Sequence, residues 1–137
     1  MVQKYIAKIH KIDGLKYDLR IYVLLCGVNP LRVYVYKDGL ARFATVPYAG
    51  PNKENMANLN MHLTNYAINK LHEDFEQNED QDKDDVGHKR SMKSVFYGIE
   101  EDMSENEMKS LIAQIYDIII KSLCLAQPHV AHLMKSC

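Results

Sequence analysis

The stretch Leu15-Lys16-Tyr17-Asp18-Leu19-Arg20-Ile21-Tyr22-Val23-Leu24-Leu25 decides the fold, because apolar and polar side chains alternate along its first half. Successive side chains of a β-strand point to opposite faces of a sheet. One face of this predicted strand then carries Leu15, Tyr17, Leu19, Ile21, Val23 and Leu25, and the other carries Lys16, Asp18 and Arg20. Alternation alone favours a solvated polar face with an ion pair, since antiparallel sheets often have one wet face.

Two further strands are expected after this one. Asn29-Pro30 is typical of a turn, and the chain from Leu31 to Tyr36 alternates again. Asp38-Gly39 is a hairpin signal, after which we expect a third strand through Thr45. The pattern predicts an antiparallel meander in which Arg42 joins the polar face.

The middle of the chain is less regular. The segment from Pro47 to Asn60 is rich in Pro, Gly and Asn, which predicts an irregular connection. Met61 to Ala67 is interpreted as a fourth short strand. Glu73 to Asp85 carries eight acidic residues against one Lys, so we expect a mobile acidic loop that stays out of the core.

A helix is predicted near the end of the chain. Ser104 and Glu107 match a capping box, in which a hydroxyl and a carboxylate pair with free amides at a helix start. An apolar stripe at helical spacing follows and is expected to be core, until Gln127-Pro128 interrupts the helix. The stripe comprises Met108, Leu111, Ile112, Ile115, Ile118, Ile119 and Ser122.

Composition limits the possible functions. The 137 residues correspond to about one domain, and a net charge of -1 argues against binding to nucleic acid. Cys26, Cys124 and Cys137 are widely spaced, which suggests neither a disulfide framework nor a zinc site. His129 and His132 lack a third ligand at suitable spacing. Apolar runs are shorter than a membrane span requires, and no secretion signal is visible, so the cytosol is the default location.

Three strings of the sequence resemble the tubulin tyrosine ligase-like family, and within it they are most similar to the tubulin polyglutamylases. These strings are Gln3 to Arg20, Gly39 to Thr45 and Met61 to Lys70. The resemblance implies a partial ATP-grasp fold of the α/β (α+β) class, with a mainly antiparallel sheet packed by helices. It covers residues 1–137 as a single domain, with the acidic loop at about 73–90.

The resemblance implies an ATP-dependent ligase that forms an amide bond. In polyglutamylases, ATP first converts a side-chain carboxylate of a tubulin tail into an acyl-phosphate, which the amine of a free glutamate then attacks. Two alternatives stay open: a noncatalytic module that binds tubulin or microtubules, and a tubulin ligase that uses glycine or tyrosine. Arg42 and the string Asn65-Tyr66-Ala67-Ile68-Asn69 favour glutamate.

The family's nucleotide-contacting positions correspond to Gln3, Lys4, Tyr5, Ile6, Lys16, Tyr17, Asp18, Thr64 and Asn65. The first four correspond to the segment that lines the adenine. An ammonium suits polyphosphate, so Lys16 is also a candidate catalytic residue. Arg20 has an alternative role, which is to hold Asp18 in a forked ion pair.

Three residues correspond to positions at the amino-acid substrate. Arg42 matches the arginine that grips the carboxylate of the incoming glutamate, and it is the second candidate catalytic residue. A planar guanidinium suits this task because it donates two parallel hydrogen bonds. Tyr66 and Lys89 are expected to lie near the same substrate.

The resemblance also implies cofactors, partners and a location. The cofactors are ATP and magnesium, and the metal ligands are expected outside this chain, as in a central fragment that lacks the family's N-terminal part and C-terminal metal-ligand segment. The expected partners are tubulin or microtubules and free glutamate, with no nucleic acid and no membrane. The expected location is the cytoplasm and the cytoskeleton, with the cilium or basal body expected at family level.

Overall fold

The computed structural model describes residues 2–78 and 83–135. Within these ranges the elements follow in the order β1, β2, α1, α2, β3, α3, α4. The chain divides into two compact units. The first consists of Met1–Arg20 and Gly39–Phe96, and the second consists of Ile21–Asp38 and Tyr97–Cys137.

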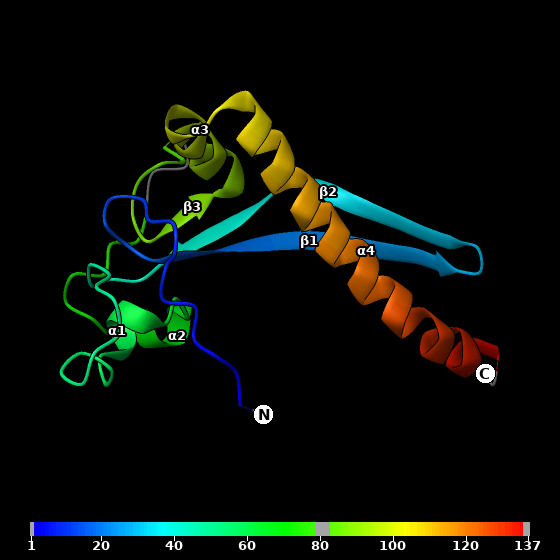
Figure 1. The fold of residues 1–137 in the computed structure, drawn as a ribbon, viewed down its shortest axis with the longest axis horizontal. Coiled ribbons are helices and arrows are strands. Elements are labelled where there is room, and N and C mark those ends of the chain that lie inside the picture. Colours follow the sequence, from blue (N-terminus) through cyan, green and yellow to red (C-terminus); the bar gives the residue numbers. More distant parts are fainter. Residues whose placement is uncertain (1, 79–82, 136–137) are drawn as a thin grey trace. The chain divides into compact units, whose positions relative to one another are not determined.

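The two long strands are β1 (Tyr17–Val28) and β2 (Leu31–Phe43). They are neighbours in the sheet and are joined by two residues, so they run in opposite directions (Figure 1). The turn predicted at Asn29-Pro30 is therefore confirmed. The second and third predicted strands are one continuous strand, which means that the hairpin predicted at Asp38-Gly39 is wrong.

Packing explains why Asp38-Gly39 does not turn. A Cβ atom at position 39 would overlap the carbonyl oxygen of Arg20, so glycine is needed here for the close approach of two strands. The tight turn lies instead at Asp13-Gly14, where φ is 54° and 74° and Ile12 bridges to Leu15. Both residues have positive φ, which an Asp-Gly pair adopts readily.

A third strand, β3 (Lys89–Ser91), completes the sheet in the order β1-β2-β3. It pairs antiparallel with β2 and places Arg42 opposite Lys89. Arg90 connects it to the Asp13-Gly14 turn through an ion pair of 2.7 Å with Asp13, and its guanidinium lies 4.3 Å from the centre of the Phe43 ring.

The strand predicted at Met61 to Ala67 is wrong, because this part of the chain forms two short helices, α1 (Leu59–His62) and α2 (Tyr66–Asn69). They lie side by side (Figure 1). Asn58 caps α1 by accepting a hydrogen bond from the Met61 amide. The end of α2 is fixed by Asn69, whose side chain is 1% exposed. Polar anchoring by asparagine side chains therefore overrides the short strand pattern.

Asn69 connects α2 to the end of the sheet. Its Oδ1 accepts hydrogen bonds of 3.0 Å from both the amide and the hydroxyl of Thr45. Its Nδ2 donates to the carbonyl oxygens of Leu63 and Asn65, at 2.8 and 3.1 Å. The buried apolar residues of the first unit are Ala41, Phe43, Ala44, Tyr48, Met92 and Val95.

Two helices end the chain, α3 (Met92–Asp102) and α4 (Glu105–Lys135). The predicted capping box is confirmed. The carboxylate of Glu107 accepts from the Ser104 amide at 2.9 Å and from the Ser104 hydroxyl at 2.6 Å, while the Glu107 amide donates to that hydroxyl at 3.4 Å. The paired hydrogen bonds to Ser104 lower the pKa of the Glu107 carboxyl.

Two predictions about α4 are wrong. The helix continues through Pro128, since one missing hydrogen bond does not outweigh the others of a 31-residue helix. The predicted core stripe is not a buried core: Met108 is buried and Ile118 is 65% exposed, while the other members are half-buried or exposed. In the second unit α4 runs beside a two-stranded ribbon (Figure 1), which is too narrow to cover such a long helix.

Among the described helices, α4 is long and apolar enough to cross a membrane by length and composition. An 18-residue window within Glu105–Met134 has a mean hydropathy of 1.3, and none of that window is buried. Two ion pairs lie along it, Lys109 with Glu105 and Lys121 with Asp117. The expectation that the protein contacts no membrane therefore stays a prediction.

Candidate functional site

A carboxylate lies between two arginines at the polar face of the sheet. Arg42 donates from Nε and Nη2 to the two carboxylate oxygens of Asp18, at 3.0 and 2.8 Å. Nε of Arg20 lies 2.9 Å from the same carboxylate. Alternation correctly placed Asp18, Arg20 and Arg42 on one face. Arg20 therefore pairs with Asp18, as its alternative role suggested, while the forked geometry is seen for Arg42.

Lys16 belongs to a second cluster, in which it contacts two uncharged acceptors. Its ammonium donates to the His62 carbonyl at 2.8 Å and to the Tyr5 hydroxyl at 3.1 Å. The Tyr5 hydroxyl also lies 3.1 Å from Nδ1 of His62, and Nε2 of His62 lies 3.1 Å from the Asn55 carbonyl oxygen. That oxygen can only accept, so Nε2 carries the proton and Nδ1 accepts from Tyr5. His62 is buried, and although it lies in the string Met61 to Lys70, no role was predicted for it from the sequence.

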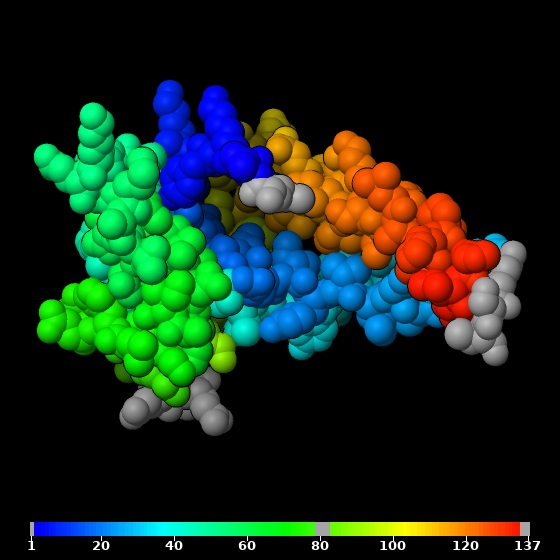
Figure 2. Space-filling view, turned by 90° about the horizontal axis from the view of Figure 1, so that it is seen from below, coloured from blue at the N-terminus to red at the C-terminus, as the bar shows by residue number. Residues whose placement is uncertain are grey.

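The N-terminal segment predicted to line the adenine lies along the first unit. Figure 2 shows these blue residues against the green segment that contains α1 and α2. Ala7 fixes the segment by accepting from the Tyr48 hydroxyl at 2.9 Å, and the Tyr48 amide donates to Gly14. Gln3, Lys4 and Ile6 are exposed, and Tyr5 is 42% exposed.

Tyr17, another predicted nucleotide contact, faces away from Lys16 and Asp18. Its ring stacks on Phe43 with centres 5.5 Å apart, and its hydroxyl lies 3.0 Å from Nδ1 of His10. Burial raises the pKa of Tyr17. These contacts indicate a packing role.

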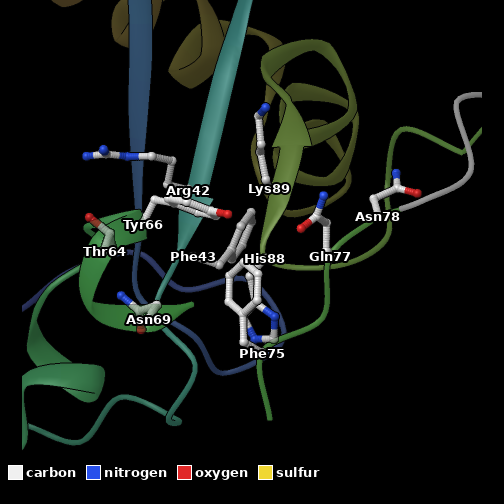
Figure 3. A pocket seen from close by; sticks show the side chains of 10 residues that line it. All are labelled: Arg42, Phe43, Thr64, Tyr66, Asn69, Phe75, Gln77, Asn78, His88 and Lys89. Carbon is white, nitrogen blue, oxygen red and sulfur yellow. The ribbon is translucent and has the colours of Figure 1, made fainter. Parts of the chain in front are cut away.

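A pocket of about 310 Å³ opens beside Arg42 (Figure 3). All three residues predicted to lie at the amino-acid substrate, namely Arg42, Tyr66 and Lys89, line it, as does Thr64. The register of β2 and β3 explains the two cations, because Arg42 and Lys89 are opposite each other. The other lining residues are Phe43, Asn69, Phe75, Gln77, Asn78 and His88.

One wall of this pocket comes from the start of the predicted acidic loop. Phe75 stacks on His88 with ring centres 5.5 Å apart, and its ring meets the edge of Tyr66 at 5.8 Å. Gln77 and Asn78 continue the wall. No local sequence pattern indicated these residues, apart from one aromatic residue in an acidic run. Residues 79–82 of the predicted mobile loop lie outside the described residues.

The predicted residues therefore fall into two groups. The amino-acid positions share the pocket, whereas Lys16 and Tyr5 form the cluster around His62 and do not line it. Asn65 is exposed at the start of α2, where its side chain makes no capping hydrogen bond. Arg42 lines the pocket, whereas Lys16 and Asp18 are not among its described lining residues.

The described residues contain no ready cluster of metal ligands. In residues 2–78 and 83–135, no group of three or more His, Cys, Asp or Glu side chains could hold a metal ion. The carboxylate of Asp18 is already paired with two arginines. The described part of the chain therefore offers cations that suit anionic ligands.

Comparison with known proteins shows the family of this chain. The sequence profile of the Tubulin-tyrosine ligase family matches residues 1–136. The chain is 48% identical over 137 residues to a Tetrahymena thermophila protein named "Probable beta-tubulin polyglutamylase". It is 40% identical over 137 residues to tubulin polyglutamylase TTLL7 of Mus musculus, and 44% identical over 135 residues to tubulin polyglutamylase TTLL6 of Homo sapiens.

The matches cover nearly the whole of this chain but a small part of each relative. They include 98% to 100% of the chain, whereas the chain spans 11% to 14% of the length of these three relatives. The mixed arrangement of an antiparallel sheet and helices is the α/β class that the resemblance implied. The chain belongs to the tubulin-tyrosine ligase family.

Proposed function

We propose that this chain supplies the amino-acid pocket of an ATP-dependent ligase that adds glutamate to a glutamate side chain of tubulin. The observation that carries the proposal is the pocket itself, in which Arg42, Tyr66 and Lys89 meet. The names of the relatives, which are tubulin polyglutamylases, support the choice of substrate.

The charges of the pocket suit glutamate. Free glutamate carries two carboxylates, and the pocket presents two cations from neighbouring strands, Arg42 and Lys89. The guanidinium of Arg42 already holds the carboxylate of Asp18 in a forked geometry. Asp18 therefore orients Arg42, and a substrate carboxylate would approach the same cation. Glycine and tyrosine lack the second carboxylate, so one of the two cations would receive no carboxylate from the substrate.

The nucleotide is assigned to the cluster around Lys16. Both acceptors of its ammonium are uncharged, so its positive charge stays available for a phosphate. Tyr5, held by His62, fixes where this ammonium lies. When bound, ATP would activate the acceptor carboxylate towards amide formation. Magnesium ligands are not assigned to this chain, and its action on tubulin in the cytoplasm or at the cytoskeleton is part of the proposal.

A chimaera tests the proposal. Residues 1–137 would replace the matching segment of the Tetrahymena relative, and incorporation of labelled glutamate, glycine or tyrosine into tubulin tails would be measured with ATP and magnesium. We expect glutamate incorporation, lost on Arg42→Lys because the ammonium cannot form a fork. Arg32→Lys, in the second unit, is the matched control and should keep the activity.

Other results would overturn the proposal. Incorporation of glycine or tyrosine in place of glutamate would give the chain a different substrate. If the parent enzyme is active while the chimaera binds microtubules but incorporates no amino acid, the noncatalytic binding module is favoured.

A further inference from the structure

His88 connects the wall of the pocket to the sheet through three hydrogen bonds. Its backbone amide donates to the Glu76 carbonyl at 3.1 Å, and its carbonyl accepts from the Phe43 amide at 2.9 Å. Its side chain accepts from the Glu76 amide, with Nδ1 3.0 Å from the amide nitrogen. The wall segment Phe75–Asn78 is therefore attached to β2 through His88.

The third bond fixes the protonation state of the ring. A backbone amide only donates, so Nδ1 of His88 must be the unprotonated nitrogen and Nε2 carries the proton. Burial lowers the pKa of His88, and the charge of Arg90 lowers it further, while Glu76 and Asp74 act in the opposite direction. The neutral ring also stacks on Phe75 with an interplanar angle of 27°.

The backbone conformation at Gly87 allows the close approach of His88 to Glu76. Gly87 has φ of 80°, and a Cβ atom there would lie 2.9 Å from the Glu76 carbonyl oxygen. Arg90 holds the Gly87 carbonyl with a hydrogen bond of 3.0 Å. The chain therefore approaches Glu76 closely at a position that suits glycine.

We propose that His88 is a positioning residue, whose neutral Nδ1 atom holds the wall Phe75–Asn78 in place and thereby sets the affinity of the pocket for its amino acid. The identity of that amino acid, glutamate, rests on the function proposed above. The role of Nδ1 is separate from that of the ring, because stacking on Phe75 requires only an aromatic side chain.

Protonation of His88 would remove the acceptor for the Glu76 amide. A histidine with a lowered pKa in the folded state stabilises that state fully above its unfolded value of about 6.5, and the stabilisation is lost as the pH falls below it towards the folded value. Binding of the amino acid should weaken over the same range. The carboxylates of Glu76 and Asp74 and the guanidinium of Arg90 face the ring, so their titration must be separated from that of His88.

Nuclear magnetic resonance on the labelled 137-residue chain tests the proposal without any ligand. At neutral pH we expect nitrogen shifts of a neutral His88 ring protonated at Nε2, and a coupling across the hydrogen bond between the Glu76 nitrogen and Nδ1. A ring protonated at Nδ1 would overturn the proposal, even if glutamate binds.

A matched pair of variants separates the acceptor from the ring. His88→Asn keeps an acceptor near the position of Nδ1 and loses the ring, whereas His88→Phe keeps the ring and loses the acceptor. Titration with glutamate should show His88→Phe binding about tenfold more weakly than wild type, the size expected for one lost hydrogen bond, and His88→Asn within about threefold of wild type.

Equal losses in both variants would overturn the role of Nδ1. If wild type binds no glutamate, the function proposed above fails, while the ring protonation and the Glu76 coupling still decide the role of His88 in holding the wall. If neither variant folds, the same two signals in wild type decide it.

Discussion

The two units of the chain contain similar apolar residues but differ in how far these residues are buried. In the first unit, buried residues surround polar groups that have defined partners, and a pocket forms at the end of the sheet. In the second unit, large apolar side chains of α4 and of the hairpin segment Ile21–Asp38 are exposed, among them Tyr34, Ile118 and Leu125. An apolar pattern therefore shows which face of an element can be buried. Whether that face is buried depends on whether another segment packs against it.

The largest effect is expected at Asn69, because its side chain makes four hydrogen bonds inside the first unit. Asn69→Ala leaves several buried groups without partners and should lower the free energy of unfolding by about 3 kcal/mol. Chemical denaturation measures this change. A loss below about 1 kcal/mol would mean that water replaces the side chain, and the first unit would then be less tightly built than its contacts indicate.

A substitution at Gly39 should cause the next largest loss in the free energy of unfolding. Gly39→Ala puts a methyl group against the Arg20 carbonyl and should cost about 2 kcal/mol, since the strands must move apart. Gly98→Ala is the control, because no atom lies within 4 Å of a Cβ at that helical position. It should stabilise the chain by about 0.5–1 kcal/mol. Thermal unfolding measures the stability of both variants. If Gly39→Ala stabilised the chain as Gly98→Ala does, the close approach at Gly39 would be contradicted.

Substitution of one exposed and one buried apolar residue compares the contributions of the two units to the free energy of unfolding. Leu125→Ala, at a side chain that is 84% exposed, should change the free energy of unfolding by less than about 0.5 kcal/mol. Val95→Ala, at a side chain that is 2% exposed, should cost about 2 kcal/mol. A large loss at Leu125 in dilute solution would show that the helix is covered there.

Much of the fold could be predicted from local chemistry. Alternation from Leu15 onwards placed Asp18 and Arg42 on one face, and the capping box at Ser104 located the start of α4. These signals succeed because they depend on neighbours in the sequence or on strand geometry.

Other features depend on contacts between distant residues. The same dipeptide, Asp-Gly, turns at 13–14 and continues a strand at 38–39, and only the position of the Arg20 carbonyl separates the two cases. The short helices near 59–69 depend on Asn69, whose partners lie up to 24 residues away. The aromatic wall of Phe75 and His88 likewise joins residues that no local pattern connects.

The decisive experiment is calorimetric titration of the 137-residue chain with glutamate, and with glutamine as the matched ligand that lacks the side-chain charge. The pocket between Arg42 and Lys89 should bind glutamate more tightly than glutamine by tenfold or more, with Arg42→Lys reducing the difference. Equal affinity for the two ligands, or a preference unchanged by Arg42→Lys, would contradict a pocket built for an amino acid with two carboxylates.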